Sequence, residues 1–163
     1  MENKIEKAYF AGGCFRGVEY YFQKLAGVLS TRVGYMGGNI DNPTYEQVSS
    51  HKTGHSEVVE VVFDKEKTSF EEIAKLFFEI HDPTQVDGQG PDIGNQYRSI
   101  IFYTTPKQKD ITEKLIAILK KKWYKVVTEL KEATHFWKAE EYHQKYYDKK
   151  HTVPYCHFYT KRF

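Results

Sequence analysis

An apolar segment that runs into two glycines and then into an amphipathic segment constrains the fold of this chain most. In Phe10-Ala11-Gly12-Gly13-Cys14-Phe15, a strand expected over residues 7–11 gives way to a helix expected over residues 14–25. The glycines allow a tight turn and let another molecule approach the backbone closely. Because a helix N-terminus carries partial positive charge, this position favours the thiolate form of Cys14. The alternative is a small buried cysteine at an ordinary turn.

The rest of the chain interleaves strand and helix patterns. Further strands are expected over residues 28–35, 56–64, 98–104 and 126–130, and further helices over residues 68–81, 107–122 and 139–147. Residues 81–96 follow neither period, and a connection of that length is usually mobile or functional. We therefore predict a single α/β or α+β domain over residues 1–163, a sandwich with a mixed sheet and flanking helices that ends in a long aromatic tail.

The composition excludes several classes of partner. The chain of 163 residues has 24 Lys and Arg against 22 Asp and Glu, a net charge of +2, so neither nucleic acid nor an anionic membrane is expected as its main partner. We find no stretch long and apolar enough to span a bilayer. The start, Met1-Glu2-Asn3-Lys4, lacks the basic and apolar regions of a signal peptide, so we expect a cytoplasmic location.

The two cysteines, Cys14 and Cys156, lie near opposite ends of the chain. Two cysteines in 163 residues do not form a disulfide framework, although a transient catalytic disulfide stays open. Neither belongs to a C-x-x-C pair, and the seven histidines show no metal-ligand spacing. The sequence therefore predicts no metal site and no cofactor.

Four clusters of polar and aromatic residues are candidates to meet Cys14 in the fold. They are residues 34–38 with Tyr35, residues 53–57 with Glu57, residues 90–99 with Asp92 and Tyr97, and the tail with Cys156. Each has a purely structural alternative: the tyrosines as core rings, Glu57 as an exposed strand position, and Asp92 as a turn former.

Taken together and in this order, these clusters carry a resemblance to a known family. The matching stretches are Gly13-Cys14-Phe15, Gly34-Tyr35-x-Gly37-Gly38, Tyr45-Glu46-Gln47-Val48, Thr53-Gly54-His55-x-Glu57-x-Val59, His81-Asp82-Pro83-Thr84, Gln89-Gly90-x-Asp92-x-Gly94-x-Gln96-Tyr97-Arg98-Ser99 and Ala139-Glu140-x-Tyr142-His143-Gln144. Over nearly its whole length the chain resembles the A-type peptide methionine sulfoxide reductases. The resemblance implies a two-layer α/β sandwich and reduction of methionine S-sulfoxide, free or in oxidised peptides and proteins.

The resemblance also assigns roles to single residues. Cys14 would attack the sulfur of the sulfoxide, and Glu57 would protonate the sulfoxide oxygen, which leaves poorly unless protonated. To hold its proton near neutral pH, Glu57 must be buried among apolar groups. Tyr35 and Tyr97 match the tyrosines whose hydroxyls donate toward the developing charge on oxygen. Asp92 matches a residue that helps to arrange this polar end of the pocket, through Tyr97 or ordered water.

Attack would leave Cys14 as a sulfenic acid, a reversible oxidation state of cysteine. Cys156, in Tyr155-Cys156-His157-Phe158, resembles the C-terminal resolving cysteine of two-cysteine members, carried on a mobile tail over residues 148–163. Thioredoxin or a similar dithiol protein would then reduce the disulfide by exchange. The alternative for Cys156 is an idle thiol, with glutathione or another external thiol resolving instead. We expect a monomer.

The chain departs from the family at Arg16. The family places a tryptophan there, which with Phe15 forms an apolar pocket for the S-methyl group of the substrate; the expected substrate-binding residues are Gly13, Phe15, Arg16, Tyr35, Glu57 and Tyr97. An arginine offers an aliphatic stem but carries a charge that resists burial. Its cation would also depress the pKa of Cys14 if the guanidinium lay beside the sulfur. Our hypothesis is a working reductase with weakened activity.

Two other functions stay open at this stage. One is a cysteine acyl-transfer enzyme, in which His55 or His143 acts as the base for Cys14. The other is a module that binds oxidised methionine with little or no turnover, because the tryptophan is absent.

Overall fold

The protein is described from a computed structural model, in which residues 3–163 are placed; Met1 and Glu2, part of the segment assessed for a signal peptide, lie outside the described residues. The strands of the main sheet are β1 (Ile5–Gly12), β2 (Val28–Met36), β3 (Ser56–Asp64), β6 (Ser99–Tyr103), β7 (Glu129–Glu132) and β8 (Trp137–Lys138). The helices are α1 (Phe15–Phe22), α2 (Tyr45–Ser49), α3 (Phe70–Ile80), α4 (Pro106–Lys121) and α5 (Tyr146–Lys150). A second, two-stranded sheet pairs β4 (Gly88–Gln89) with β5 (Asp92–Ile93), and single 3-10 turns form at Asn95–Tyr97 and Glu141–His143.

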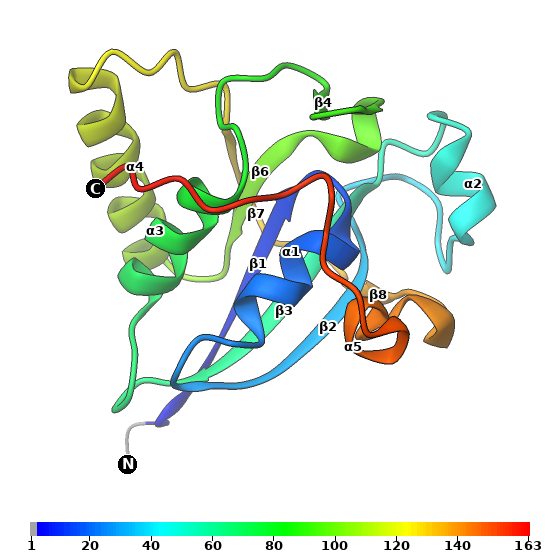
Figure 1. Ribbon diagram of the computed structural model, residues 1–163, viewed down its shortest axis with the longest axis horizontal. Coiled ribbons are helices and arrows are strands. Elements are labelled where there is room, and N and C mark those ends of the chain that lie inside the picture. Colours follow the sequence, from blue (N-terminus) through cyan, green and yellow to red (C-terminus); the bar gives the residue numbers. More distant parts are fainter. Residues whose placement is uncertain (1–2) are drawn as a thin grey trace.

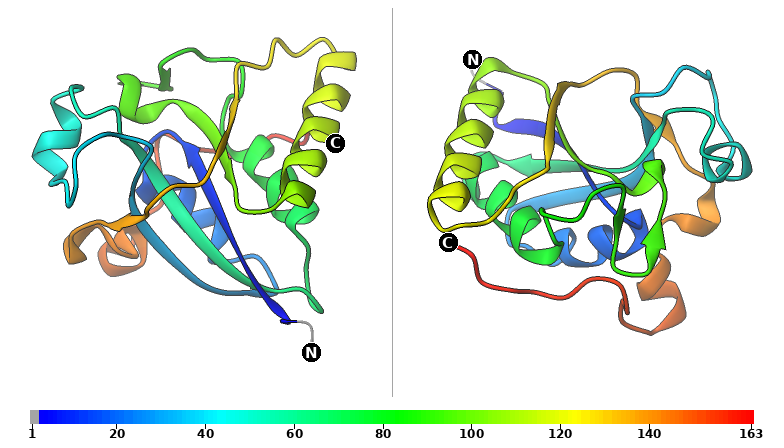
Figure 2. Two further views of the ribbon diagram at one scale, coloured as in Figure 1. Left: turned by 180° about the vertical axis from the view of Figure 1, so that it is seen from behind. Right: turned by 90° about the horizontal axis from the view of Figure 1, so that it is seen from above.

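The main sheet is mixed, as the sequence predicted. Its order is β7-β6-β1-β3-β2-β8, with β6 and β7 parallel and the other neighbours antiparallel. Helices α1, α3 and α4 lie on one side of this sheet, so the molecule has two layers (Figures 1 and 2). In this part of the chain, residues 3–163, none of the helices has both the length and the apolar composition that crossing a membrane requires.

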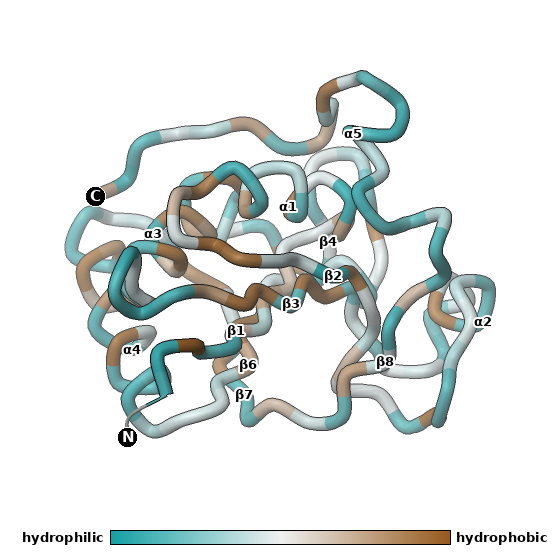
Figure 3. The backbone as a smooth tube through the Cα atoms, turned by 90° about the horizontal axis from the view of Figure 1, so that it is seen from below, coloured by the Kyte–Doolittle hydropathy of each residue, from teal (hydrophilic) through white to brown (hydrophobic). Residues whose placement is uncertain are grey.

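The central strands separate two apolar clusters because alternate side chains of a strand point to opposite faces. The larger cluster lies under the helices and includes Phe10 of β1 and Val59 of β3, with Phe22 of α1 and Phe77 of α3. The ring of Phe10 lies 5.1 Å from those of Phe22 and Phe77, measured between centroids. A smaller cluster on the other face joins Ala11, Met36, Val58, Ile100 and Phe102, and Figure 3 shows the same concentration of apolar residues along β1 and β3.

Short polar side chains start the helices that build the helical layer. The Ser69 side chain accepts a hydrogen bond from the Glu72 N–H at α3, and that of Thr105 accepts one from the Gln108 N–H at α4. Such caps satisfy backbone donors that lack partners within the helix. These starts agree with the sequence prediction to within two residues.

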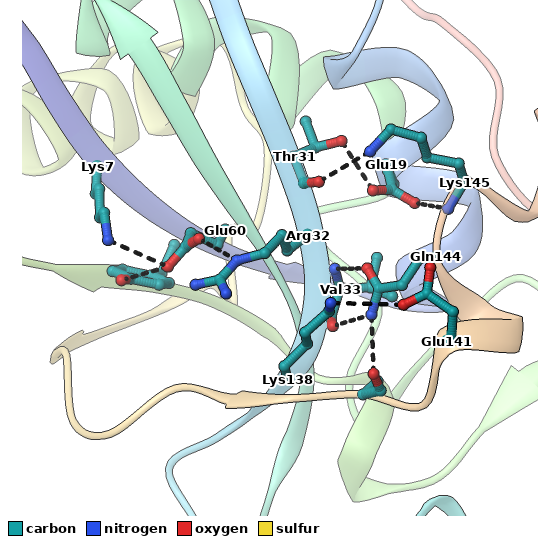
Figure 4. A network of polar contacts seen from close by, with 12 residues as sticks. Lys7, Glu19, Thr31, Arg32, Val33, Glu60, Lys138, Glu141, Gln144 and Lys145 are labelled. Atoms are coloured by element: carbon teal, nitrogen blue, oxygen red, sulfur yellow. Dashed lines mark hydrogen bonds and ion pairs between the residues drawn. The ribbon is translucent and has the colours of Figure 1, made fainter.

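The sequence prediction was wrong in the C-terminal third. The helix expected over residues 139–147 is a 3-10 turn followed by α5, and Lys145 between them has a positive φ of 51°. The reason is Gln144, whose side chain replaces helical hydrogen bonding. Its amide oxygen accepts from the Val33 N–H at 2.9 Å, and its amide nitrogen donates to the carbonyls of Val33 and Ala139 at 2.9 and 3.0 Å (Figure 4).

Two smaller differences concern strands. The strand expected over residues 126–130 is β7 at Glu129–Glu132, shifted toward the C-terminus. The irregular loop over residues 81–96 contains the β4–β5 hairpin, in which Gln89 pairs with Asp92. This hairpin brings a carboxylate oxygen of Asp92 within 4.8 Å of the sulfur of Cys14, the residue before α1.

The C-terminal tail runs along the outer side of α1 and α3, where Figures 1 and 2 show it in red. Its backbone is tied down at several points: the Tyr21 hydroxyl donates to the His157 carbonyl at 3.1 Å, and the Thr160 N–H donates to the Glu79 carbonyl at 2.7 Å. The Arg162 N–H donates to the Glu79 carboxylate at 3.0 Å. The tail of this structure is therefore docked on the helical layer, and its mobility in solution stays a prediction.

Replacing Gln144 by alanine is expected to lower the free energy of unfolding by about 2 kcal/mol, because it leaves the buried backbone groups of Val33 without partners. Urea denaturation monitored by circular dichroism measures the change. Lys150→Ala, at an exposed position of α5, is the control and should change stability by less than about 0.5 kcal/mol. Equal stability of the two variants would contradict the role given to Gln144.

Candidate active site

Cys14 lies at the junction of β1 and α1, as the sequence predicted. It is the N-cap residue of α1, and its carbonyl accepts the Gly17 and Val18 N–H groups at 3.1 and 3.3 Å. Gly13 before it has a φ of +93°, in the left-handed region that favours glycine. The turn leaves Cys14 half-buried.

Glu57 is buried at the start of β3, with 2% of its surface exposed. One carboxyl oxygen accepts the N–H of Phe15, the residue after Cys14, at 3.2 Å. The other oxygen, Oε2, is buried without a hydrogen-bond partner among the described residues. Burial raises the pKa of Glu57 well above its ordinary value, and a negative charge on Cys14 would raise it further. This carboxyl therefore holds a proton, and its free oxygen can donate it.

Tyr35 lies directly opposite Glu57 in the register between β2 and β3, so the two side chains share the face under α1. Its hydroxyl donates to the Glu140 carboxylate at 2.9 Å, and the other oxygen of Glu140 accepts the Tyr45 N–H at 2.9 Å. Burial first, and then the bond to Glu140, raise the pKa of Tyr35. In this structure the hydroxyl proton of Tyr35 is directed at Glu140.

Tyr97 and Asp92 come from the long loop before β6. Arg98 holds this loop against the start of β3, because its guanidinium donates to the carbonyls of Asn95 at 2.8 Å and Gly54 at 3.1 Å. Burial raises the pKa of Tyr97, and the charges of Glu57 and Asp92 raise it further.

Cys156 is buried beside Cys14. The two sulfurs and a carboxylate oxygen of Asp92 all lie within 4.8 Å of one another, and neither cysteine forms a disulfide in this structure. This group offers three possible ligand atoms, whereas a structural zinc site needs four protein ligands; a disulfide needs only the two thiols. The absence of a metal site stays a prediction.

The pKa of Cys14 differs from the sequence expectation. Backbone amides of Arg16 and Gly17 near the sulfur lower it, as expected for a helix N-terminus. The hydrogen bond to Cys156, followed by burial, raises it by more, so the pKa of Cys14 lies well above its ordinary value. The expectation of a favoured thiolate is wrong for this arrangement, because a second thiol occupies the space beside the first.

Arg16 contacts His143 and Tyr146 through its guanidinium. Its guanidinium donates to Nδ1 of His143 from Nε at 3.1 Å and approaches the same nitrogen from Nη2 at 2.8 Å. It also stacks on the Tyr146 ring, 4.0 Å from the centroid. Burial and this cation lower the pKa of His143 to about 4. The ring of Phe15, the neighbour of Arg16, packs 5.1 Å from His143 and 5.7 Å from Tyr35 between centroids.

The two histidines considered as bases for Cys14 have other partners. Besides His143, His55 accepts the Gly38 N–H at Nδ1, 3.0 Å away, and contacts the Ile40 carbonyl through Nε2 at 2.7 Å. The sequence motifs assigned no role to Glu140 or His157, although Glu140 lies in the motif over residues 139–144. His157 contacts the Cys156 sulfur through Nδ1 at 3.1 Å, and only its position next to a cysteine could have indicated a functional role from the sequence.

Glu57→Gln is expected to raise the free energy of unfolding at pH 8. The unfolded carboxyl ionises near its ordinary pKa of 4.5, whereas the folded one keeps its proton to higher pH. The folded state therefore binds more protons above pH 4.5, and the stability of the unmodified protein falls as the pH rises. An amide does not ionise, so the advantage of the variant should vanish below about pH 4. Urea unfolding at a series of pH values measures this.

Glu60→Gln is the matched control, on the opposite face of the same strand. Burial alone would raise the pKa of Glu60, but hydrogen bonds from Arg32 at 2.7 Å and Tyr9 at 2.9 Å lower it. Its ionised form stabilises the fold above pH 4.5 and loses that effect as the pH falls, so this variant should be destabilised at pH 8. The same sign of change for both variants would contradict the assignment of a protonated Glu57.

The comparisons with known proteins agree with this geometry. The family model "Peptide methionine sulfoxide reductase" matches residues 6–163. Peptide methionine sulfoxide reductase MsrA of Geobacter metallireducens is 48% identical over 152 residues, which cover 90% of this chain and 93% of the relative.

Solved structures give the same result. Mxr1 from Saccharomyces cerevisiae in reduced form has a TM-score of 0.90 at 32% identity, covering 96% of this chain and 92% of that chain. Mxr1 in complex with Trx2 has a TM-score of 0.65 at 21% identity, covering 96% and 90%, and this likeness shows the fold alone. The match of the family model to all but the first five residues, together with 48% identity to a curated relative, shows that this chain belongs to the MsrA family of peptide methionine sulfoxide reductases.

Proposed function

We propose that this protein reduces methionine S-sulfoxide, free or in oxidised peptides and proteins, to methionine. The observation that carries the proposal is the buried carboxyl of Glu57, which accepts the N–H of the residue after Cys14 and whose Oε2 lacks a hydrogen-bond partner among residues 3–163. A sulfoxide oxygen needs a proton before its bond to sulfur breaks, and burial, which raises the pKa of Glu57, favours the carboxyl form that can supply one.

In the first half of the reaction, the Cys14 sulfur attacks the sulfur of the sulfoxide while Glu57 protonates the oxygen. The oxygen is transferred to Cys14, which becomes a sulfenic acid, the proton that the Cys14 thiol gives up returns to Glu57, and the sulfide is released as methionine. The sulfoxide gains two electrons and the cysteine loses two. Tyr97, whose pKa is raised by burial and also by the charges of Glu57 and Cys14, would donate to the oxygen. Tyr35 can donate to it once its hydroxyl turns from Glu140.

In the second half, Cys156 resolves the sulfenic acid. The separation of the sulfurs, under 4.8 Å, supports direct condensation to a disulfide with loss of water. A groove lined by residues of the 80–91 segment and of the tail reaches Cys156 from outside and gives an external thiolate access to it. The relation to Mxr1, which has been solved in complex with Trx2, supports thioredoxin as the reductant. A cytoplasmic location follows as part of the proposal, because free thiols persist where reductants are supplied.

Acyl transfer is disfavoured by the partners of His55 and His143, which leave Cys14 without a histidine base. A module that binds oxidised methionine without turnover would need neither a second thiol within 4.8 Å of Cys14 nor a protonated carboxyl beside it.

Mixing the reduced protein with methionine S-sulfoxide in the absence of reductant tests the proposal. We expect one equivalent of methionine, a mass lower by two hydrogens, and a peptide that links Cys14 to Cys156; the R epimer should give none of these. Cys156→Ser is the control and should stop at the sulfenic acid, trapped by dimedone. A protein that binds the sulfoxide and forms no methionine would contradict the proposal.

Arg16→Trp is expected to raise kcat/KM about tenfold, because an indole contact with the S-methyl group is worth about 1–2 kcal/mol. The indole replaces a guanidinium that is held between His143 and Tyr146 in this structure. Steady-state assays with methionine S-sulfoxide and thioredoxin measure the change. Arg16→Lys, which keeps a charge and adds no apolar ring, should give no gain, and an equal rate for both variants would reject the pocket argument.

A further inference from the structure

We propose that His157 is the general base of the second half-reaction: it takes the proton of Cys156 and returns it to the hydroxyl group that leaves Cys14. This inference rests on the proposed function, because it concerns the sulfenic acid that sulfoxide reduction leaves on Cys14. It adds to that function a residue for which sequence analysis had no role.

The hydrogen bonds of His157 fix which ring nitrogen carries the proton. Nε2 lies 2.6 Å from the carbonyl oxygen of Gly12, and a carbonyl can only accept, so Nε2 is the protonated nitrogen. In a neutral imidazole the other nitrogen, Nδ1, is then an acceptor. Nδ1 lies 3.1 Å from the Cys156 sulfur, so the thiol of Cys156 donates to it. The pair is arranged for transfer of this proton from sulfur to nitrogen.

His157 is also neutral under ordinary conditions, as a base must be. It is 2% exposed, and burial lowers its pKa below the usual 6.5. The titratable groups that face it come from four segments: Cys156 beside it, Cys14 and Tyr21 of the α1 segment, Asp92 of β5 and His81 after α3. Asp92 favours the protonated ring and thereby supports transient protonation during the reaction.

The start of α1 is shaped around this ring. A Cβ atom at Gly17 would collide with Nδ1 of His157, and one at Gly13 would come within 3.2 Å of Nε2. Glycine in the first turn of a helix is less stabilising than alanine, and here it makes room for the imidazole between helix and tail. The Tyr21 hydroxyl holds the His157 carbonyl at 3.1 Å, so the ring and the backbone of His157 are both fixed.

The proposed step balances. His157 Nδ1 accepts the Cys156 proton, and the Cys156 thiolate attacks the sulfenic sulfur of Cys14. The S–S bond forms as the S–O bond breaks, and the departing hydroxide takes the proton from His157 and leaves as water. The sulfenic sulfur is reduced by the electron pair that the thiolate supplies, so the step needs no external oxidant or reductant. The sulfurs start within 4.8 Å and must close to about 2.05 Å.

A single-turnover experiment on the full chain tests this role. Reduced protein is mixed with methionine S-sulfoxide at pH 7 without reductant, and methionine, dimedone-trapped sulfenic acid and disulfide are quantified over time. In the unmodified protein, the disulfide should form at the same rate as methionine. In His157→Gln, whose amide can still donate to the Gly12 carbonyl, disulfide formed per methionine should lag at least about tenfold, because only a few per cent of a free thiol is ionised at pH 7.

The pH profile separates a base from a merely structural residue. The lag of His157→Gln should shrink as the pH rises and close near pH 9.5, where a free thiol is largely ionised. The unmodified protein should show no lag down to below pH 6.5, a measurement that does not depend on the folding of any variant. His151→Asn, an exposed histidine of the same tail, is the matched control and should behave as the unmodified protein.

Three results would overturn the inference. One is a disulfide that keeps pace with methionine in His157→Gln at pH 7, and another is a lag that persists unchanged at pH 9.5. The third is a lag in the unmodified protein that already appears as the pH falls below 8.5. Absence of methionine from the unmodified protein would instead overturn the proposed function, and this inference with it.

Discussion

The hydrogen bond from the Phe15 N–H to the buried carboxyl of Glu57 holds the site together. It joins the first turn of α1 to the central strand β3, at a point where a helix N-terminus needs an acceptor and a buried carboxyl needs a donor. Since Phe15 follows Cys14 directly, the bond also fixes the start of α1 relative to the Glu57 carboxyl. Burial raises the pKa of Glu57, so the apolar layer between α1 and β3 contributes to the proposed chemistry as well as to the fold.

The site draws on both ends of the chain. The N-terminal elements supply Cys14, Tyr35 and Glu57, and the last 25 residues supply Glu140, which binds Tyr35, and Cys156, which lies beside Cys14. Gln144 secures this arrangement because its side chain continues the hydrogen bonding of β2 through Val33 (Figure 4). Tertiary contacts of this kind make the pKa of Cys14 depend on the docked tail: the Cys156 thiol, which we propose resolves the sulfenic acid, also raises the pKa of Cys14.

Sequence patterns predicted the parts of the molecule in which local preference and tertiary packing agree. The alternation of residues 56–64 predicted β3 in full, and the motifs predicted which loops meet at Cys14. They failed where a single side chain replaced local hydrogen bonding, as Gln144 does at the predicted C-terminal helix. They also failed for the pKa of Cys14. The order of residues along the chain predicts the positive field of a helix start, which lowers this pKa. It does not predict that a second thiol, 142 positions away in the sequence, lies beside Cys14 and raises the pKa by more. The role of His157 depends on the slot between two glycines of the α1 segment, which exists only in three dimensions.

The C-terminal tail has two parts, before and after Cys156, that differ in how they contact the helices. After Cys156, hydrogen bonds from Tyr21, Thr160 and Arg162 hold the backbone to α1 and α3. Before it, residues 151–155 are exposed except for the half-buried Pro154. Closing the two sulfurs requires a movement of less than about 3 Å, which an exposed segment of five residues absorbs without breaking the anchors that follow. The proposed resolving step needs only a small shift of a docked tail, and because the Tyr21 bond lies at His157 itself, the imidazole keeps its place on α1 while the thiol beside it moves.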